Sequence, residues 1–121
     1  MIIWCASYPK SGNTWIRAII TSLVYSEDGL FNFDMLKKIN LFPKRLYFKE
    51  LTNDYSDLKK ISQHWINAQK NINSEEKLKI FKTHNGNYNF FGNDFTNKKN
   101  TAGVIYVVRD PRNVITSVAN H

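Results

Sequence analysis

A short apolar run that leads through a glycine-containing turn into a helix constrains the fold more than any other feature. The run from Ile2 to Ala6 is followed by Ser7 and Pro9, as expected for a strand buried on both faces. Asn13 or Thr14 then stands as a candidate cap before a helical pattern. Its apolar residues recur at Trp15, Ile16, Ala18, Ile19, Ile20, Leu23 and Val24. Strand, turn and helix in this order favour an α/β domain.

Two later segments also have strand patterns. Residues 78–84 alternate between apolar and polar side chains, and residues 104–108 form an apolar run. Pro111 follows the second run where a first helical residue is tolerated. The sequence predicts one domain over residues 1–121, with a P-loop-like, three-layer α/β/α architecture around a central parallel sheet.

The intervening segments differ in character. Residues 26–77 contain short amphipathic patches, which we interpret as a helical insertion and not as a second domain. Residues 85–100 form an Asn- and Gly-rich stretch with aromatic anchors, typical of a loop. The helix after Pro111 is predicted to be still running at His121, so we expect the domain to be truncated at its C-terminus.

Composition narrows the class of protein. Hydrophobic residues make up 42% of 121 residues, enough for a packed core, and no apolar run is long enough for a membrane span. The single cysteine, Cys5, fits a reducing, cytoplasmic location. The net charge of +7 favours a polyanionic partner. The Lys/Arg doublets are scattered, so we expect no nucleic acid; oligomeric state is left open.

The turn from Tyr8 to Trp15 predicts an oxyanion site. It joins a buried strand to a helix N-terminus, where free backbone N–H groups and the helix dipole favour an anion. Gly12 permits close approach, Ser11 and Thr14 offer hydroxyls, and Lys10 adds a positive charge. A Walker-A loop requires Gly before Lys-Ser/Thr, and no Gly precedes Lys10.

This turn, Tyr8-Pro9-Lys10-Ser11-Gly12-Asn13-Thr14-Trp15, resembles the 5′-phosphosulfate loop of sulfotransferases that use 3′-phosphoadenosine-5′-phosphosulfate (PAPS). The family usually has Thr at the position of Asn13. Lys82-Thr83-His84 is similar to the strand end that carries the family's catalytic histidine. Residues 104–117 are similar to its 3′-phosphate-binding strand and helix, with Arg109 and Ser117 8 positions apart. The three matches occur in the family's order.

The resemblance implies a role for each matched residue. Those expected to hold the 5′-phosphosulfate are Lys10, Ser11, Gly12, Asn13 and Thr14, with Asn13 donating from its backbone and its amide. Trp15 would stack on the adenine, and Arg109 and Ser117 would bind the 3′-phosphate. His84 is expected to be the general base, Lys10 to stabilise the leaving phosphate, and Lys82 to assist.

The predicted function is therefore a transferase of EC 2.8.2 type, which moves a sulfuryl group from PAPS to a hydroxyl or amine. We expect no metal, because the three histidines and one cysteine lack ligand spacing. We expect a small-molecule or glycan acceptor, and alcohols, phenols, sugars, lipids and peptides all stay open. The lack of a Golgi-type membrane anchor argues against a lumenal carbohydrate enzyme. Residues 26–77 and the Asn-rich loop are expected to shape its pocket.

Two features depart from the family pattern. The family commonly has Pro soon after the catalytic His, whereas Asn85-Gly86 follows His84. The Arg-Lys-Gly loop of the family's C-terminal part has no counterpart here, so we expect a donor half-site with weak or no activity alone. Two other classes stay open: a P-loop kinase or NTPase, and a non-catalytic basic binding module.

Overall fold

Four parallel strands form the centre of the molecule in a computed structural model that describes residues 1–120. Their order across the sheet is β2 (Asn40–Leu41), β3 (Lys79–Thr83), β1 (Ile2–Ser7) and β6 (Thr101–Val107). Ala6 of β1 is paired with Thr83 on one side and with Tyr106 on the other. The predicted α/β architecture with a central parallel sheet is confirmed. Parallel pairing aligns the carboxyl ends of β1, β3 and β6 at one edge.

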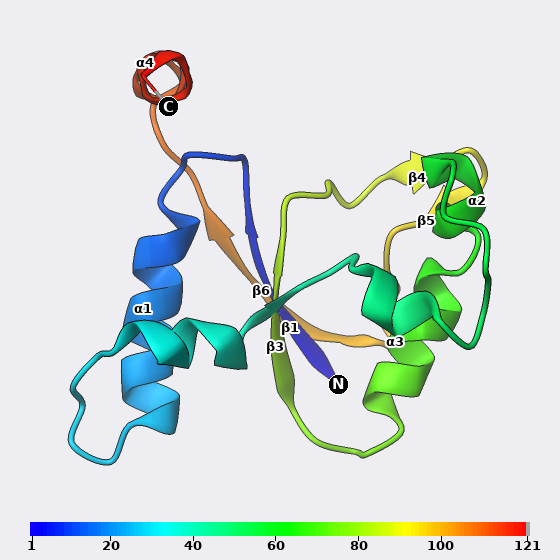
Figure 1. The fold of residues 1–121 in the computed structure, drawn as a ribbon, viewed down its shortest axis with the longest axis horizontal. Helices are drawn as coiled ribbons and strands as arrows, with labels where there is room; N and C mark the ends of the chain where they lie inside the picture. Colours follow the sequence, from blue (N-terminus) through cyan, green and yellow to red (C-terminus); the bar gives the residue numbers. More distant parts are fainter. Residues whose placement is uncertain (121) are drawn as a thin grey trace.

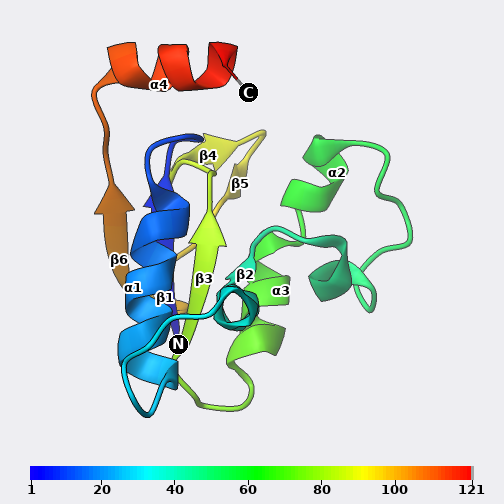
Figure 2. The ribbon, with the colours of Figure 1, turned by 60° about the vertical axis from the view of Figure 1, so that its left-hand side comes forward.

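Helices cover both faces of this sheet (Figure 1). Helix α1 (Asn13–Tyr25) packs on one face, and α2 (Leu58–Ser62) and α3 (Trp65–Asn73) lie on the other. The buried core on the α3 side is mainly aromatic, and its larger members are Trp4, Phe42, Phe48, Trp65, Phe81 and Phe95. Helix α4 (Pro111–Ala119) lies beyond the carboxyl ends of the strands, next to the β1–α1 turn (Figure 2).

The sequence predicts a helical insertion over residues 26–77, but this segment is not purely helical in the structure. Besides α2 and α3 they contain two short 3-10 helices, η1 (Phe33–Lys38) and η2 (Arg45–Phe48). They also supply β2, which extends the sheet by pairing with Phe81 and Lys82 of β3. A strand of two residues is too short for alternation to reveal it.

The Asn-rich loop contains a small hairpin, β4 (Asn89–Phe90) and β5 (Asn93–Asp94). Phe91 and Gly92 connect the two strands with φ of 49° and 83°, the two positive φ values of a type I′ turn. Phe95, directly after β5, is buried in the aromatic core, and Phe90 packs against it partly buried. Tyr88 and Phe91 are exposed, so the predicted aromatic anchoring of this loop holds for Phe90 and Phe95 and is wrong for the other two.

Two predicted helix ends are wrong by a few residues. The N-cap of α1 is Gly12, not Asn13 or Thr14, and α4 ends at Ala119 instead of running on. Asn120 N–H closes α4 on Thr116 O, while His121 lies outside the described residues. No helix among residues 1–120 has the length and apolar character needed to cross a bilayer.

Candidate functional site

The turn between β1 and α1 has a backbone conformation that is rare for side chains other than glycine. Gly12 has a φ of 104° and Lys10 a φ of 65°. Ser11 N–H donates to Tyr8 O at 3.3 Å, and Ile16 N–H donates to Gly12 O at 3.2 Å. Positive φ at a non-glycine residue costs of the order of 1–3 kcal/mol, and such residues cluster at active sites and ligand-binding turns.

The first turn of α1 offers unused hydrogen-bond donors. No side chain caps this helix. Within residues 1–120, the backbone N–H groups of Asn13, Thr14 and Trp15 have no acceptor. Ser11 is buried in the turn, Lys10 is half-buried and Thr14 is exposed. Free N–H groups at a positive helix end, with a lysine beside them, can hold an oxyanion.

Asn13 turns its side chain into the protein. Its Nδ2 donates to Cys5 O at 3.2 Å and to Ser7 Oγ at 3.1 Å, while its Oδ1 is buried without a partner. The expectation that this amide contacts the donor is therefore wrong, because its N–H groups are used within β1. The backbone N–H of Asn13 remains available to donate a hydrogen bond to a bound anion.

His84 lies at the end of β3, beside the end of β1. Its Nδ1 is 2.7 Å from Ser7 O and 3.4 Å from Ser7 Oγ. A carbonyl oxygen can only accept, so Nδ1 carries the proton in the neutral ring. The lone pair of that tautomer is on Nε2, the atom that can receive a proton.

Arg109 reaches the β1–α1 turn from the end of β6. Its Nη1 donates to Lys10 O at 3.1 Å. The neighbouring carboxylate of Asp110 pairs instead with Arg112 at 2.7 Å and accepts from Arg112 N–H as the α4 cap. Arg109 is exposed and forms no ion pair within residues 1–120.

The other two expected donor contacts lie on helices. The Trp15 side chain is 79% exposed in the first turn of α1, so it does not face the core. Ser117 lies on α4, half-buried, and has no hydrogen bond to the β1–α1 turn. The structure therefore brings Lys10, Arg109 and His84 to one edge of the sheet. Among residues 1–120, Ser117 forms no hydrogen bond with these three residues.

Lys82 lies in a cationic cluster next to α1. Burial and the nearby Arg17 lower the pKa of Lys82, and burial raises the pKa of the Cys5 thiol. Arg17 Nη2 donates to Leu36 O at 2.6 Å and Ile39 O at 3.0 Å, which ties α1 to η1. Sequence reasoning missed Arg17, because backbone carbonyls 19 and 22 residues away leave no sequence signal.

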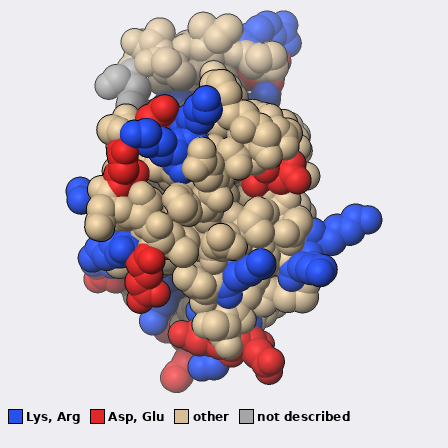
Figure 3. Space-filling model, turned by 90° about the vertical axis from the view of Figure 1, so that its right-hand side faces the viewer, with Lys and Arg blue, Asp and Glu red and all other residues tan. Residues whose placement is uncertain are grey.

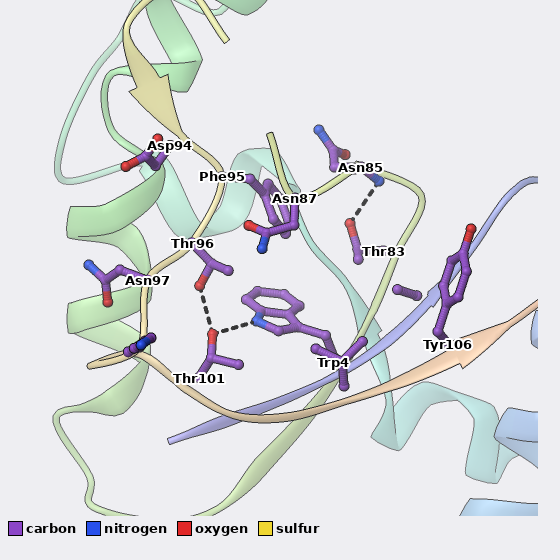
Figure 4. A pocket seen from close by; sticks show the side chains of 14 residues that line it. Trp4, Thr83, Asn85, Asn87, Asp94, Phe95, Thr96, Asn97, Thr101 and Tyr106 are labelled. Carbon is purple, nitrogen blue, oxygen red and sulfur yellow. Dashed lines mark hydrogen bonds between the residues drawn. The ribbon is translucent and has the colours of Figure 1, made fainter. Parts of the chain in front are cut away.

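Two cavities open beside these groups. One of about 380 Å³ lies between the β1–α1 turn and α4, and Ser11, Arg109 and Val114 line it. The larger one, about 680 Å³, lies on the opposite sheet face from α1 (Figure 4). Thr83 and Asn85, the neighbours of His84, line the larger cavity. Its loop wall comes from the Asn-rich stretch, and none of residues 26–77 lines it.

Charges of both signs are interspersed over the face that carries α2 and α3 (Figure 3). Lys60 pairs there with Asp54, and Lys79 pairs with Glu75. The continuous basic stripe of a nucleic-acid-binding surface is not seen on this face. No three His, Cys, Asp or Glu side chains of residues 1–120 gather as metal ligands.

Comparison with known proteins gives one match. A family model described as "Sulfotransferase domain" matches residues 2–121. Neither a curated protein nor a solved structure matches the chain.

Proposed function

Because this chain belongs to the sulfotransferase family, we propose that it takes its sulfuryl group from PAPS and passes it to a small acceptor. One observation carries this proposal: Arg109 Nη1 bonds Lys10 O at 3.1 Å. The contact joins Arg109, the candidate 3′-phosphate-binding residue, to the candidate phosphosulfate loop. An ordinary nucleotide has no 3′-phosphate, so a second anion site beside the first favours PAPS over ATP.

The β1–α1 turn fits the phosphosulfate end of this donor. Its free N–H groups and the half-buried Lys10 can neutralise the anion without a metal. Gly12 adopts the positive φ of 104° that this turn requires, which a residue with a side chain rarely does. The cavity between this turn and α4 leaves room beside Arg109 for the ribose 3′-phosphate, which a guanidinium can bind bidentately. Trp15, largely exposed, is available to stack on adenine. Together these residues form a donor half-site, and we retain Ser117 as a proposed 3′-phosphate contact.

His84 is the proposed general base. Its Nδ1–H donates to Ser7 O, so Nε2 accepts the proton of the acceptor hydroxyl or amine. The acceptor atom attacks sulfur as the bond from sulfur to the phosphate oxygen breaks, and adenosine 3′,5′-bisphosphate leaves. Lys10 compensates the charge that grows on that oxygen. Lys82, two residues before His84 in the sequence, is proposed to assist.

A reducing, cytoplasmic location is also proposed, and the free thiol of Cys5 supports it.

A thermal-shift experiment tests the donor assignment. We expect adenosine 3′,5′-bisphosphate to raise the melting temperature, and 5′-AMP, ATP-Mg²⁺ and a single-stranded oligonucleotide to raise it much less. Arg109→Ala should abolish the difference between adenosine 3′,5′-bisphosphate and 5′-AMP. Preferential stabilisation by ATP-Mg²⁺ would instead favour a kinase or NTPase, and preference for the oligonucleotide a binding module.

A further inference from the structure

A buried asparagine links the β1–α1 turn to His84, the proposed base. We infer that Asn13 is a positioning residue: by holding the Ser7 hydroxyl, it keeps His84 in the tautomer whose Nε2 accepts a proton. The inference rests on the proposed function, because it concerns the base of that reaction. The amide of Asn13 lies inside the protein, so it acts through Ser7 and not on a substrate.

These residues lie on the face of the sheet that α1 covers. Cys5 and Ser7 point to that face from β1, because alternate residues of a strand share a face. Asn13 Nδ2, in the first turn of α1, donates to Cys5 O at 3.2 Å and to Ser7 Oγ at 3.1 Å. His84 directly follows β3, and its Nδ1 is 2.7 Å from Ser7 O. A continuous set of contacts therefore runs from the start of α1 to the proposed base.

The orientation of the Asn13 amide follows from its partners. Cys5 O is a carbonyl oxygen and only accepts hydrogen bonds, so the NH₂ group of the amide must face it. The amide oxygen Oδ1 is then buried without a partner within residues 1–120. An unsatisfied buried acceptor costs free energy, so stability alone does not account for an asparagine here. What the amide does is hold Cys5 O and Ser7 Oγ in fixed positions.

The two oxygens of Ser7 favour opposite tautomers of His84. The carbonyl oxygen, 2.7 Å from Nδ1, can only accept, so it favours hydrogen on Nδ1. The hydroxyl can also donate, and donation to Nδ1 requires a lone pair there, which places the ring hydrogen on Nε2. A neutral ring with hydrogen on Nε2 cannot take a proton at that atom. At 3.4 Å from Nδ1, the hydroxyl is farther away than in a good hydrogen bond, so the carbonyl determines the tautomer.

Asn13 keeps the Ser7 hydroxyl at this distance. Its N–H on Ser7 Oγ fixes the side-chain torsion of Ser7. Asn13 is 5% exposed and Ser7 is 4% exposed, so water does not readily replace the bond between them. Without this bond, the Ser7 side chain is free to turn its hydroxyl towards Nδ1. The His84 ring is exposed, so these contacts, and not packing, fix its tautomer.

Proton–nitrogen correlation NMR tests the inference, because the two ring nitrogens differ between the tautomers. Spectra are recorded at about pH 8.5, above the ordinary histidine pKa of about 6.5, where the ring is neutral. The signals of His84 are those lost in His84→Ala. We expect most rings of the unmodified chain to carry hydrogen on Nδ1, and about half or fewer in Asn13→Ala. Asn13→Leu keeps the volume of the amide, so it should give the same change and serves if Asn13→Ala does not fold.

Removal of the Ser7 hydroxyl separates this role from a merely structural one. Ser7→Ala leaves only the carbonyl beside Nδ1, so this variant should keep hydrogen on Nδ1. It should also restore that tautomer when combined with Asn13→Ala, which a general loosening of the turn would not do. Asn100→Ala is the matched control, since Asn100 is 3% exposed, donates to Ile66 O and lies beside the start of β1. It should lower stability and leave the His84 tautomer unchanged.

The outcomes separate the positioning role from the proposed function. Hydrogen on Nε2 in the unmodified chain, an unchanged tautomer in the Asn13 variants, or no restoration by Ser7→Ala would overturn the role of Asn13. Binding of adenosine 3′,5′-bisphosphate is titrated with the same samples. If this nucleotide binds but the Asn13 variants leave the tautomer unchanged, the positioning role is wrong and the proposed function stands. The expected tautomer changes without nucleotide binding would support the role of Asn13 and contradict the use of PAPS.

Discussion

Replacement of Gly12 by alanine isolates the contribution of the turn conformation to donor binding. A Cβ at Gly12 would meet only Val107 Cγ1 at 4.0 Å, an ordinary contact, so the change adds no clash. What remains is backbone strain, because φ is 104° there. A left-handed conformation costs an L-residue about 1–2 kcal/mol. The donor-bound state, which needs this turn, should rise in free energy by that amount.

The cost can appear in two measurable ways. If Gly12→Ala keeps the turn, unfolding becomes easier, and about 1 kcal/mol lowers the melting temperature of a domain this size by roughly 4 °C. If the turn relaxes, binding of adenosine 3′,5′-bisphosphate must restore it, and 1–2 kcal/mol weakens the Kd about five- to thirtyfold. Calorimetric titration and thermal unfolding together capture the full cost.

Gly29→Ala is the matched control. Gly29 has a φ of 75° and no atom within 4 Å of a built Cβ, so it carries similar strain outside the site. We expect it to lower stability and to leave the nucleotide Kd unchanged. The reasoning fails if Gly12→Ala binds as tightly as the unmodified chain at equal stability, or if Gly29→Ala weakens binding equally.

Three further outcomes are expected. In an intact enzyme, His84→Ala should abolish turnover while PAPS still binds; unchanged turnover would remove His84 from the mechanism. Arg109→Ala should weaken adenosine 3′,5′-bisphosphate by about ten- to a hundredfold and leave 5′-AMP nearly unaffected, since a charge-assisted hydrogen bond contributes about 1.5–3 kcal/mol; equal losses for both nucleotides in titration calorimetry would contradict this role. Lys82→Met should raise the melting temperature at pH 7, because burial lowers the Lys82 pKa and so disfavours its charged form. At pH values between the folded and unfolded pKa of Lys82, the unfolded chain then binds more protons than the folded chain. The stability of the unmodified protein should therefore rise relative to that of Lys82→Met as the pH approaches 10.5. A stability difference between the two proteins that widens with pH would refute this reasoning.

The large elements could be predicted because periodicity reveals them. The apolar run of β1 and the helical spacing of α1 are long enough to read without a structure. The two residues of β2 are not, since pairing with β3 and not local propensity makes them a strand. The same holds for the N-cap of α1, where Asn13 is drawn away from capping by Cys5 O and Ser7 Oγ.

The candidate site was predictable in composition but not in contacts. The sequence indicated that Lys10, His84 and Arg109 each follow a predicted strand, and parallel strands place such residues at one edge of a sheet. That Arg109 bonds Lys10 O, and that Ser7 O orients His84, depends on strand order and register. These are long-range properties that local patterns do not encode.

The proposed binding groups lie on separate segments, at the strand ends and in the Asn-rich loop, which bears on how the sequence of this protein could change. Groups proposed to bind PAPS follow β1 and β6, whereas the Asn-rich stretch, expected to shape the acceptor pocket, belongs to the connection between β3 and β6. That connection is fastened to the rest of the molecule at Phe95 and through Gln69, which donates to Phe95 O. Sequence changes between His84 and Phe95 would therefore alter this connection while the groups that follow β1 and β6 stay in place.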